Sequence, residues 1–473
     1  MRVCGHLDNL SPDGSASLVR AGPAGFRDTW HGGGGVGGAR RARQDGWMRR
    51  RRAHVERRRD AKETETGAGL SAGMISAVIA LTLMGPFTSD GLLPALPALA
   101  AEFGASADRV QLTITAATFG VAIGQLLLGT LSDARGRRGL LLVGGAGMVL
   151  ASVLGAVSTS LWMLILACGL LGLTSAAGLA LGRAVLADRL SGGILTRAYS
   201  LWGAVIGVAP MLAAVGGAQI LTFSGWRAIF WAFAALALAT LLLTVLWLPE
   251  TLPPERRVRT SWRTFGQSLA EVFRSRVFVA SSFVAWLGFA AVFAYTSASP
   301  FILQTMLGFS PTGFSLVLAA DGAGLMIASA IAAKLAIRFT PVRLMAIGLS
   351  IASLGALAAV YAIAFDAVNA VTMVTSMVLV GGSMGFVFGA ATSLALLDLG
   401  RIAGTALAVM GALQFVFAGI AAPLVGVAGD RSAVPYAIVI AVIVVGSWIS
   451  LAAAARVSTG RWQASAPAAA DAG

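Results

Sequence analysis

Apolar positions along this chain form long, nearly unbroken runs, instead of the alternation of a half-buried strand or the one-sided stripe of a soluble helix. From Ser71 onward these runs recur with short polar breaks, and about 20 apolar residues in a helix cross the hydrocarbon core of a bilayer. The pattern predicts an all-α membrane protein with twelve transmembrane helices. Their expected ranges are 72–95, 108–131, 139–158, 161–187, 196–222, 226–248, 276–303, 311–335, 342–364, 367–392, 401–428 and 433–455.

One long polar interruption divides the twelve runs into six and six. A faint repeat supports the division, since "GVAPMLAAVGG" before the interruption resembles "GIAAPLVGVAG" after it. Duplicated halves that meet around a midplane site are typical of secondary transporters that work by alternating access. The expected parts are a six-helix bundle at 71–248, a cytoplasmic linker at 249–275, a second six-helix bundle at 276–455 and a cytoplasmic tail at 456–473.

The linker contains apolar residues at helical spacing among polar ones, which predicts a helix that lies on the membrane surface. These residues are Trp262, Phe265, Leu269 and Phe273.

Residues 1–70 are rich in Gly, Arg and Ala and show no apolar period that could build a core. This composition predicts a disordered basic tail. The tail has no apolar run of the secretory-signal type, and Met48 and Met74 are plausible later initiators, so an over-extended start is one interpretation. Another is an arm that binds anionic lipid through its arginine runs.

Composition agrees with a membrane protein, because 57% of residues are hydrophobic, 12% are charged and the mean hydropathy is +0.81. The net charge of +14 could suggest nucleic acid, but the basic residues lie between apolar spans and form no single soluble face. With both termini in the cytoplasm, the inner breaks and C-terminal tail hold 18 Lys and Arg residues and the outer breaks hold three. Basic residues accumulate on the cytoplasmic side, so we expect this orientation in the cell membrane and no nucleic-acid partner.

Catalytic and metal chemistry find little support in the sequence. The two cysteines, Cys4 and Cys168, form no disulfide framework, and no Cys/His cluster has metal-ligand spacing. All three histidines lie in the leading tail, and no nucleotide loop or nucleophile with a base is visible. We therefore expect no enzyme, no metal and no cofactor, while a membrane sensor that does not transport remains an alternative.

The sharpest motif is "GTLSDARGRR", in the short break between the second and third spans. Its glycine permits close helix contact, and its charged residues can pair with one another and with helix ends at the membrane surface. The spacing G-x-x-x-D-x-x-G-R-R resembles the signature of the major facilitator superfamily. The residues that carry it are Gly129, Asp133, Arg135, Gly136, Arg137 and Arg138.

Further stretches narrow the resemblance to the Bcr/CflA group of twelve-span drug:proton antiporters. Between about Asp90 and Asp430 they include "DGLLPALP", "RAVLADRL", "APMLAAVGG", "GWRAIFW", "LPETLPPERR" and "AYTSASPFILQTMLGFSP". The resemblance implies two six-helix bundles around a central cavity. It also implies proton-driven export of lipophilic, often cationic or zwitterionic compounds.

Asp90 is an acid inside an apolar run, roughly 28 Å along its expected helix and so in the outer part of the membrane. A mid-bilayer aspartate costs on the order of 3 kcal/mol, so it should face a cavity or be protonated during part of its cycle. The family places an acid here, which implies proton coupling, although Leu92 replaces its usual aromatic. A carboxylate that caps a helix end at the outer interface is the alternative.

Asp321 is a second intramembrane acid, in "VLAADGAGL" of the eighth span. Its role could be a second protonation site, a contact to a substrate cation or a hydrogen-bonded structural acid.

Arg183 and Asp188, at the inner end of the fourth span, are expected to form an interface ion pair. Earlier in that span Cys168 stands where the family commonly has an arginine, which puts the family's coupling mechanism in doubt for this chain.

The fifth span has the composition of a bending helix. Pro210 removes a backbone hydrogen bond, and Gly216 with Gly217 admits close packing. The resemblance implies a gating helix, although Ala214 replaces the family's second proline; an ordinary kinked helix is the alternative. For the substrate cavity we select polar and aromatic residues of the seventh and eleventh spans. They are Tyr295, Ser297, Ser299, Gln304, Gln414 and Phe415. Packing between helices is an equal alternative for each of them.

The function that fits best is efflux of lipophilic drugs or toxic metabolites in exchange for protons, by a monomer. The runner-up is proton-coupled transport of one physiological solute, such as a sugar or an amino acid. A cavity lined by many hydrogen-bonding groups would favour the runner-up, yet few such groups are visible in the spans.

The basic tail yields the first testable prediction. We expect deletion of residues 1–69 to leave transport intact, because no span or candidate site lies in them. Membrane insertion and transport of the truncated chain would be measured beside the full chain. Failure of the truncated chain to insert would contradict the prediction.

Overall fold

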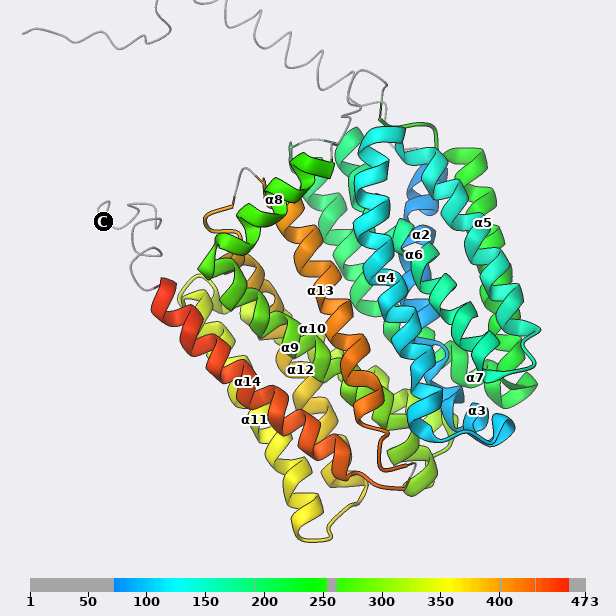
Figure 1. Ribbon diagram of the computed structural model, residues 1–473, viewed down its shortest axis with the longest axis vertical. Coiled ribbons are helices and arrows are strands. Elements are labelled where there is room, and N and C mark those ends of the chain that lie inside the picture. The colour runs from blue at the N-terminus through cyan, green and yellow to red at the C-terminus, as the bar shows by residue number, and fades with distance from the viewer. Residues whose placement is uncertain (1–71, 191, 253–261, 400–401, 430, 459–473) are drawn as a thin grey trace, which may run out of the picture. The chain divides into compact units, whose positions relative to one another are not determined.

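The computed structural model describes residues 72–190, 192–252, 262–399, 402–429 and 431–458. The leading tail and residues 459–473 lie outside this part. Within it the regular elements are helices, in agreement with the predicted fold class (Figure 1). Before the linker they are α2 (Ala72–Asp90), η1 (Leu93–Ala95), α3 (Leu96–Phe103), α4 (Ala107–Arg135), α5 (Arg137–Ala156), α6 (Leu161–Arg189) and α7 (Gly192–Trp247).

The linker contains α8 (Trp262–Arg274), at the place where the sequence predicts a helix. Of the predicted apolar stripe, Leu269 is half-buried and Phe273 is exposed, whereas Val272, outside the stripe, is buried. The side chains of Trp262 and Phe265 are not described. The remaining helices are α9 (Arg276–Ser299), η3 (Pro300–Met306), α10 (Pro311–Leu335), α11 (Pro341–Ala364), α12 (Ala370–Ala395), α13 (Ala403–Leu424) and α14 (Val434–Ser458).

Short polar side chains fix where many of these helices begin. Ser160, Ser275, Ser310 and Thr340 each accept a hydrogen bond from a backbone N–H of the first turn, and Asn369 forms a complete capping box with the following turn. Such caps satisfy backbone donors that have no partner within the helix. They explain why most predicted spans start within a few residues of the observed helices.

Two predicted spans are joined in α7. Gly225 interrupts this helix with φ 76° and ψ 175°, a conformation that glycine adopts without steric cost. Eleven helices of the described residues are long and apolar enough to cross a membrane, and one of them, Val208–Trp247, contains this break. Counting the two sides of Gly225 separately gives the twelve expected passes.

The first span is longer than predicted. It continues beyond α2 through η1 and α3 to Phe103, instead of ending at residue 95. Pro94 and Pro97 interrupt regular helix without ending the apolar run, because proline is tolerated in the first turn of each new helical segment. Asp90 therefore lies within the span, at the end of α2.

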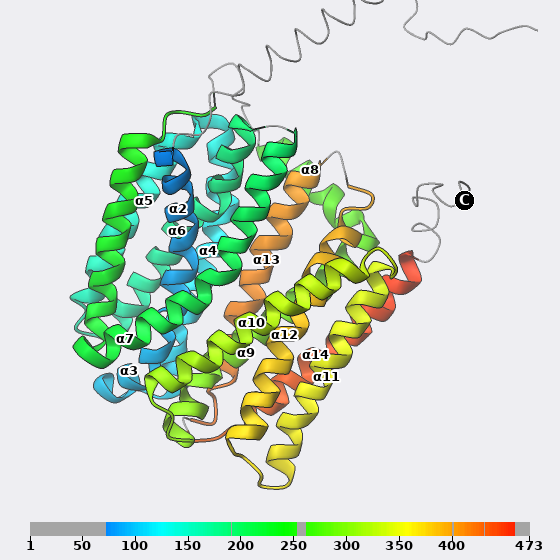
Figure 2. The same ribbon diagram turned by 180° about the vertical axis from the view of Figure 1, so that it is seen from behind.

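The helices form two bundles of six passes. In the first, α2 packs on α7 and α6, and α4 and α5 pack on α6; in the second, α9 and α10 pack on α12, and α11 and α14 on one another (Figures 1 and 2). Glycines permit the closest approaches, as at Gly172, where a Cβ would overlap with the backbone of Ala117. The bundles meet along α4 with α13 and α7 with α10, and we call this boundary the seam.

Two adjacent glycines of α7 allow a matched test of close packing. A Cβ on Gly217 would overlap with the carbonyl oxygen of Gly91, whereas a Cβ on Gly216 would meet nothing within 4 Å. We expect Gly217→Ala to destabilise the protein by about 1–3 kcal/mol and Gly216→Ala to be neutral or stabilising. Thermal unfolding of both purified variants, followed by tryptophan fluorescence, measures the difference. Equal unfolding temperatures would show that the Gly91 contact is not required.

Candidate functional site

The two ends of the bundles differ in charge. The end at which α4 gives way to α5 carries Arg137, Arg138 and Arg189, and it is called the basic end. The other end, where α3 leads into α4 and α9 continues into η3, is called the opposite end. Among described residues it carries Arg109, Arg227 and Arg431.

Four hydrogen bonds cross the seam within the described residues, and each lies in the half of the helices toward the opposite end. Three use backbone carbonyl acceptors, and the fourth joins two side chains. They are Gln111 Nε2 to Ser297 O at 2.9 Å, Thr115 Oγ1 to Gly419 O at 2.9 Å, Gln304 Nε2 to Pro94 O at 3.1 Å, and Gln219 Nε2 to Thr312 Oγ1 at 3.4 Å. The bundles are thus joined by neutral hydrogen bonds at the opposite end.

Asp90 ends α2 close to the seam. Its side chain is half-buried, and Ser89 Oγ donates to Asp90 Oδ2 at 3.2 Å. The next residue, Gly91, is the one against which Gly217 of α7 packs. The negative end of a helix dipole gives a carboxylate no electrostatic support, and in the described part of the chain Asp90 has no cationic partner. An ionised Asp90 is therefore poorly compensated.

A small cavity lies beside Ser89, the residue before Asp90. Cys168 of α6 lines it and is buried, at the position where the sequence departs from the resembled family. Leu171, one turn later, is also buried. The departure thus places a buried thiol in the cavity that Ser89 also lines. The lining residues are Thr88, Ser89, Leu92, Leu93, Leu96, Thr113, Ile114, Ala117, Thr118 and Cys168.

Asp321 lies on α10 and is 7% exposed. The Tyr295 hydroxyl of α9 donates a hydrogen bond to Asp321 Oδ2. The other oxygen, Oδ1, is buried and has no hydrogen-bond partner among the described residues. A Cβ on Gly381 of α12 would overlap with this oxygen, so α12 approaches the carboxyl group as closely as its backbone permits.

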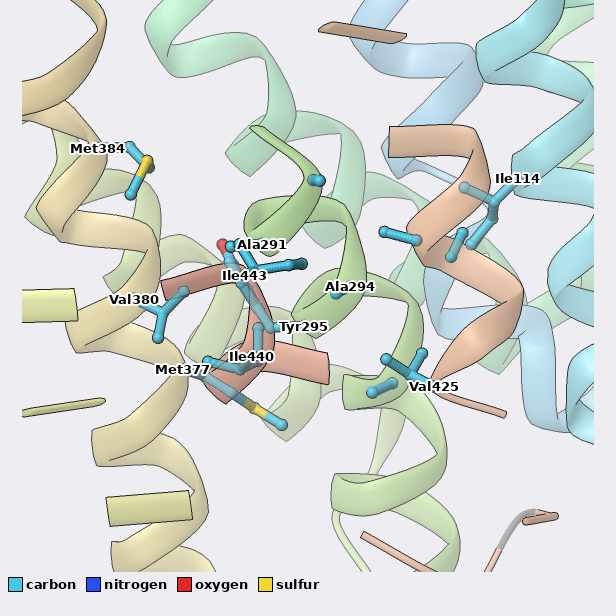
Figure 3. Packing of buried hydrophobic residues seen from close by; sticks show 14 of the residues in the cluster. Ile114, Ala291, Ala294, Tyr295, Met377, Val380, Met384, Val425, Ile440 and Ile443 are labelled. Atoms are coloured by element: carbon cyan, nitrogen blue, oxygen red, sulfur yellow. The ribbon is translucent and has the colours of Figure 1, made fainter. Parts of the chain in front are cut away.

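Apolar side chains enclose the phenol that binds Asp321. Figure 3 shows Tyr295 beside Met377 and Val380 of α12 and Ile440 of α14, and all of these residues are buried. Nearby, the Tyr436 hydroxyl and Ser376 Oγ lie 2.8 Å apart and satisfy each other. The pair of Asp321 and Tyr295 is therefore held in a dry environment within the second bundle.

The six selected cavity residues do not gather on one surface. Ser299 is buried and donates to Thr296 O of its own helix. Ser297 and Gln304 belong to the seam, and Tyr295 belongs to the Asp321 pair. Gln414 and Phe415 of α13 are half-buried.

Phe415 belongs to an aromatic cluster that sequence reasoning missed. Phe289 lies 4.9 Å from Phe293, 5.9 Å from Phe388 and 5.1 Å from Phe415, measured between ring centroids. All four rings are half-buried, and their planes are tilted by 44° to 78° to one another. They form an irregular apolar surface that aromatic ligands can contact by stacking or edge to face. The spacing of Phe289 and Phe293, one helical turn apart on α9, is the signal that could have revealed it.

The signature motif is anchored at the basic end. Gly136 joins α4 to α5 with φ 98°, in the region that favours glycine. Arg137 Nε donates to Asp188 Oδ2 at 3.3 Å, and Thr251 Oγ1 donates to the same oxygen at 3.0 Å. Arg138 binds Val245 O at 2.9 Å. The part of the chain that the structure describes does not include the side chains of Asp133 and Arg183 or the surroundings of Gly129. The expected pair of Arg183 with Asp188 therefore stays a prediction. The basic partner of Asp188 in the structure is Arg137.

Glu250, after α7, was not selected from the sequence. Its Oε1 accepts hydrogen bonds from the backbone N–H groups of Arg137 at 2.9 Å, Thr251 at 3.0 Å and Leu252 at 3.1 Å. Burial acts to raise the pKa of this carboxyl, but the backbone N–H groups outweigh burial and hold the pKa below its usual value. Glu250 therefore joins the end of α7 to the start of α5 as an anion.

We expect Glu250→Gln to lower the free energy of unfolding by about 1–3 kcal/mol at neutral pH. Because the folded-state pKa lies below the unfolded-state value, the contribution is present above the unfolded value and is lost as the pH falls through the folded value. The gap between wild type and variant should therefore narrow below about pH 4. Thermal unfolding across pH tests this, and a gap that widens in acid would contradict it.

Residues 78–423 match the family model of the Major Facilitator Superfamily. The uncharacterized MFS-type transporter YdgK of Bacillus subtilis is 33% identical over 370 residues, which cover 78% of this chain and 92% of YdgK. The multidrug resistance protein MdtL of Vibrio parahaemolyticus is 27% identical over 240 residues, and the match covers 51% of this chain and 60% of MdtL.

Among solved structures, this chain is similar to a bacterial homolog of the human lysosomal transporter Spinster, with TM-score 0.65 and 16% identity over 84% of this chain and 99% of that one. It is also similar to a D-xylose-proton symporter, with TM-score 0.62 and 19% identity over 80% and 98% of the two chains. At these identities the likeness shows the fold alone. The family match, the similarity to YdgK over most of both chains and the two bundles of six passes show that this chain belongs to the major facilitator superfamily of membrane transporters.

Proposed function

We propose that this transporter exports lipophilic, often cationic compounds from the cytoplasm in exchange for protons, by alternating access. The observation that carries the proposal is the pair of intramembrane acids, Asp90 and Asp321, neither with a cationic partner among the described residues. Intramembrane carboxylates without a counter-charge are costly, and they mark proton or cation pathways. The likeness to multidrug resistance proteins supports an export role.

The orientation proposed from the arginines places the basic end, and both chain termini, in the cytoplasm. In that orientation the four seam bonds close the protein toward the outside. Substrate would then enter from the cytoplasm, along the apolar interior that contains the aromatic cluster. The rings of Phe289, Phe293, Phe388 and Phe415 suit flat hydrophobic ligands, which favours a lipophilic substrate over a sugar.

In the proposed cycle, ionised Asp90 favours binding of a cationic substrate from the cytoplasmic side. After reorientation, a proton from outside binds Asp90 and removes its charge, and the substrate leaves. One proton that crosses 100 mV yields about 2.3 kcal/mol, and one pH unit adds about 1.4 kcal/mol. Together they could maintain a substrate gradient of roughly a few hundredfold per proton.

A drug-sensitive bacterium that lacks its main pumps tests the proposal. We expect the wild-type chain to raise resistance to several lipophilic compounds and Asp90→Asn to reduce it to the level of the empty vector, because a neutral amide cannot exchange a proton. Asp366→Asn, at an exposed aspartate between α11 and α12, is the matched control and should keep resistance. Full resistance with Asp90→Asn would remove Asp90 from coupling.

Proteoliposomes separate transport from sensing. The compound added would be one to which the wild-type chain confers resistance. Its transport should be accompanied by proton movement across the membrane in the direction opposite to that of the compound. Transport of a sugar or amino acid alone would favour the single-solute alternative. Absence of any proton movement would contradict proton coupling.

A further inference from the structure

Asp321 and Asp90 differ in the space around their carboxyl groups. Asp90 is half-buried and the residue before it, Ser89, lines a small cavity, so its carboxyl group is less enclosed than that of Asp321. Asp321 Oδ1 presses against Gly381, where even a methyl group would overlap with it, and Oδ2 is taken by the Tyr295 hydroxyl. The space at Asp321 thus admits a proton and excludes an ammonium group or any other organic cation.

No opposite charge compensates Asp321 from the elements that pack against it. Helix α12, η1 and η3 carry no ionisable side chain among the described residues. The described part of α7 faces α10 with Met211, beside Gly322, and with Gln219, beside Thr312. On α10 itself Lys334 lies at the basic end, three turns away.

The titratable groups near Asp321 are acids and phenols. Tyr295 of α9 donates to it, and Tyr436 of α14 is occupied by Ser376. An ionised Asp321 would therefore keep one donor and gain no cation. In a dry site such a charge is unfavourable.

The same carboxyl group lies where α10 is held between two neighbours. Gly381 of α12 touches one side of Asp321, while the next residue, Gly322, lies against Met211 of α7 across the seam. Gly381 of α12 covers Oδ1 and α7 covers the residue beside it, so water reaches this carboxyl group only if the packing around α10 loosens. Ionisation, which needs that water, therefore opposes the packing of α10 seen here, and protonation favours it.

We propose that Asp321 is a proton-only site, with Tyr295 as its positioning residue, and that its protonation stabilises the arrangement in which the bundles are joined at the opposite end. The step is an acid–base equilibrium: the carboxylate takes a proton from water on the accessible side, an O–H bond forms, and no other atom is transferred. The proposal rests on the proposed proton-coupled export. It assigns the cationic substrate to Asp90 and the buried proton to Asp321.

Pulsed electron paramagnetic resonance on the purified full chain tests the link between protonation and conformation without any substrate. Spin labels at Phe223→Cys and Val371→Cys, two exposed positions at the opposite end of the two bundles, would be introduced after Cys4→Ser and Cys168→Ser. We expect the short distance between labels to dominate near about pH 5 and to lose population toward about pH 9. Asp321→Asn, neutral at every pH, should keep the short distance throughout.

Tyr295→Phe separates a positioning role from a merely structural one and retains the acid if Asp321→Asn fails to fold. The phenol stabilises the ionised carboxylate, so its loss should move the midpoint of the transition to higher pH by about one to two units. A change of population that is equal at every pH would overturn the role of Tyr295. The assignment of the proton site to Asp321 would be overturned if the distances in Asp321→Asn changed with pH as they do in the wild type. It would also be overturned if Asp90→Asn were the one variant that lost the pH dependence.

Equilibrium binding of tetraphenylphosphonium, a permanent lipophilic cation, tests whether the site is for protons only. Asp321→Asn should leave the dissociation constant within about twofold, whereas Asp90→Asn should raise it by about tenfold or more. A tenfold loss with Asp321→Asn would show that substrate reaches Asp321 and would overturn the assignment. If the wild type binds no lipophilic cation, the proposed export fails, while the distance measurement still decides the proton site.

Discussion

Hydrocarbon offers no hydrogen bonds, and this constraint governs both the fold and the chemistry of the chain. Backbone groups are satisfied inside helices, so polar side chains in the spans mostly bind a carbonyl of the preceding turn, as Thr82 and Ser152 do. The few that reach another helix are therefore informative. Several of them join the bundles at the seam, hold Asp321 or anchor the basic end, and others link helices within one bundle, as Trp286 does to Met410 O and Arg227 to Glu102.

These three places use different kinds of polar contact. The seam uses neutral hydrogen bonds, which can break and re-form without moving charge through the membrane. The basic end uses ion pairs and charge-assisted bonds around Arg137, Asp188 and Glu250, at a surface where water can solvate them. Away from the ends of the spans, the carboxyl groups of the described residues are those of Asp90 and Asp321. This distribution suits a protein whose two halves must rock while few charges change state.

Much of the fold could be predicted from hydrophobic run length alone, because membrane thickness fixes the length of a span. The run length misplaced the end of the first span, since prolines at 94 and 97 start new helical segments inside it. The candidate site was harder. Asp90 and Asp321 stood out because an acid inside a membrane span is costly. The close contact between Gly381 and Asp321 and the grouping of the four rings depend on how each helix is rotated about its axis, and the periodicity of a uniformly apolar helix does not define that rotation. Glu250 escaped notice because its partners are backbone N–H groups, which every sequence possesses.

The seam has a consequence for how this family of chains can diverge. At Ser297, Gly419 and Pro94 the acceptor is a main-chain oxygen, which no codon change can delete. Mutational risk therefore falls on the donors Gln111, Thr115 and Gln304, and at Gly419 on the acceptor residue too, because a Cβ there would overlap with Thr118 and Phe119. Closure on this side can be inherited unchanged through many rounds of change in what is carried.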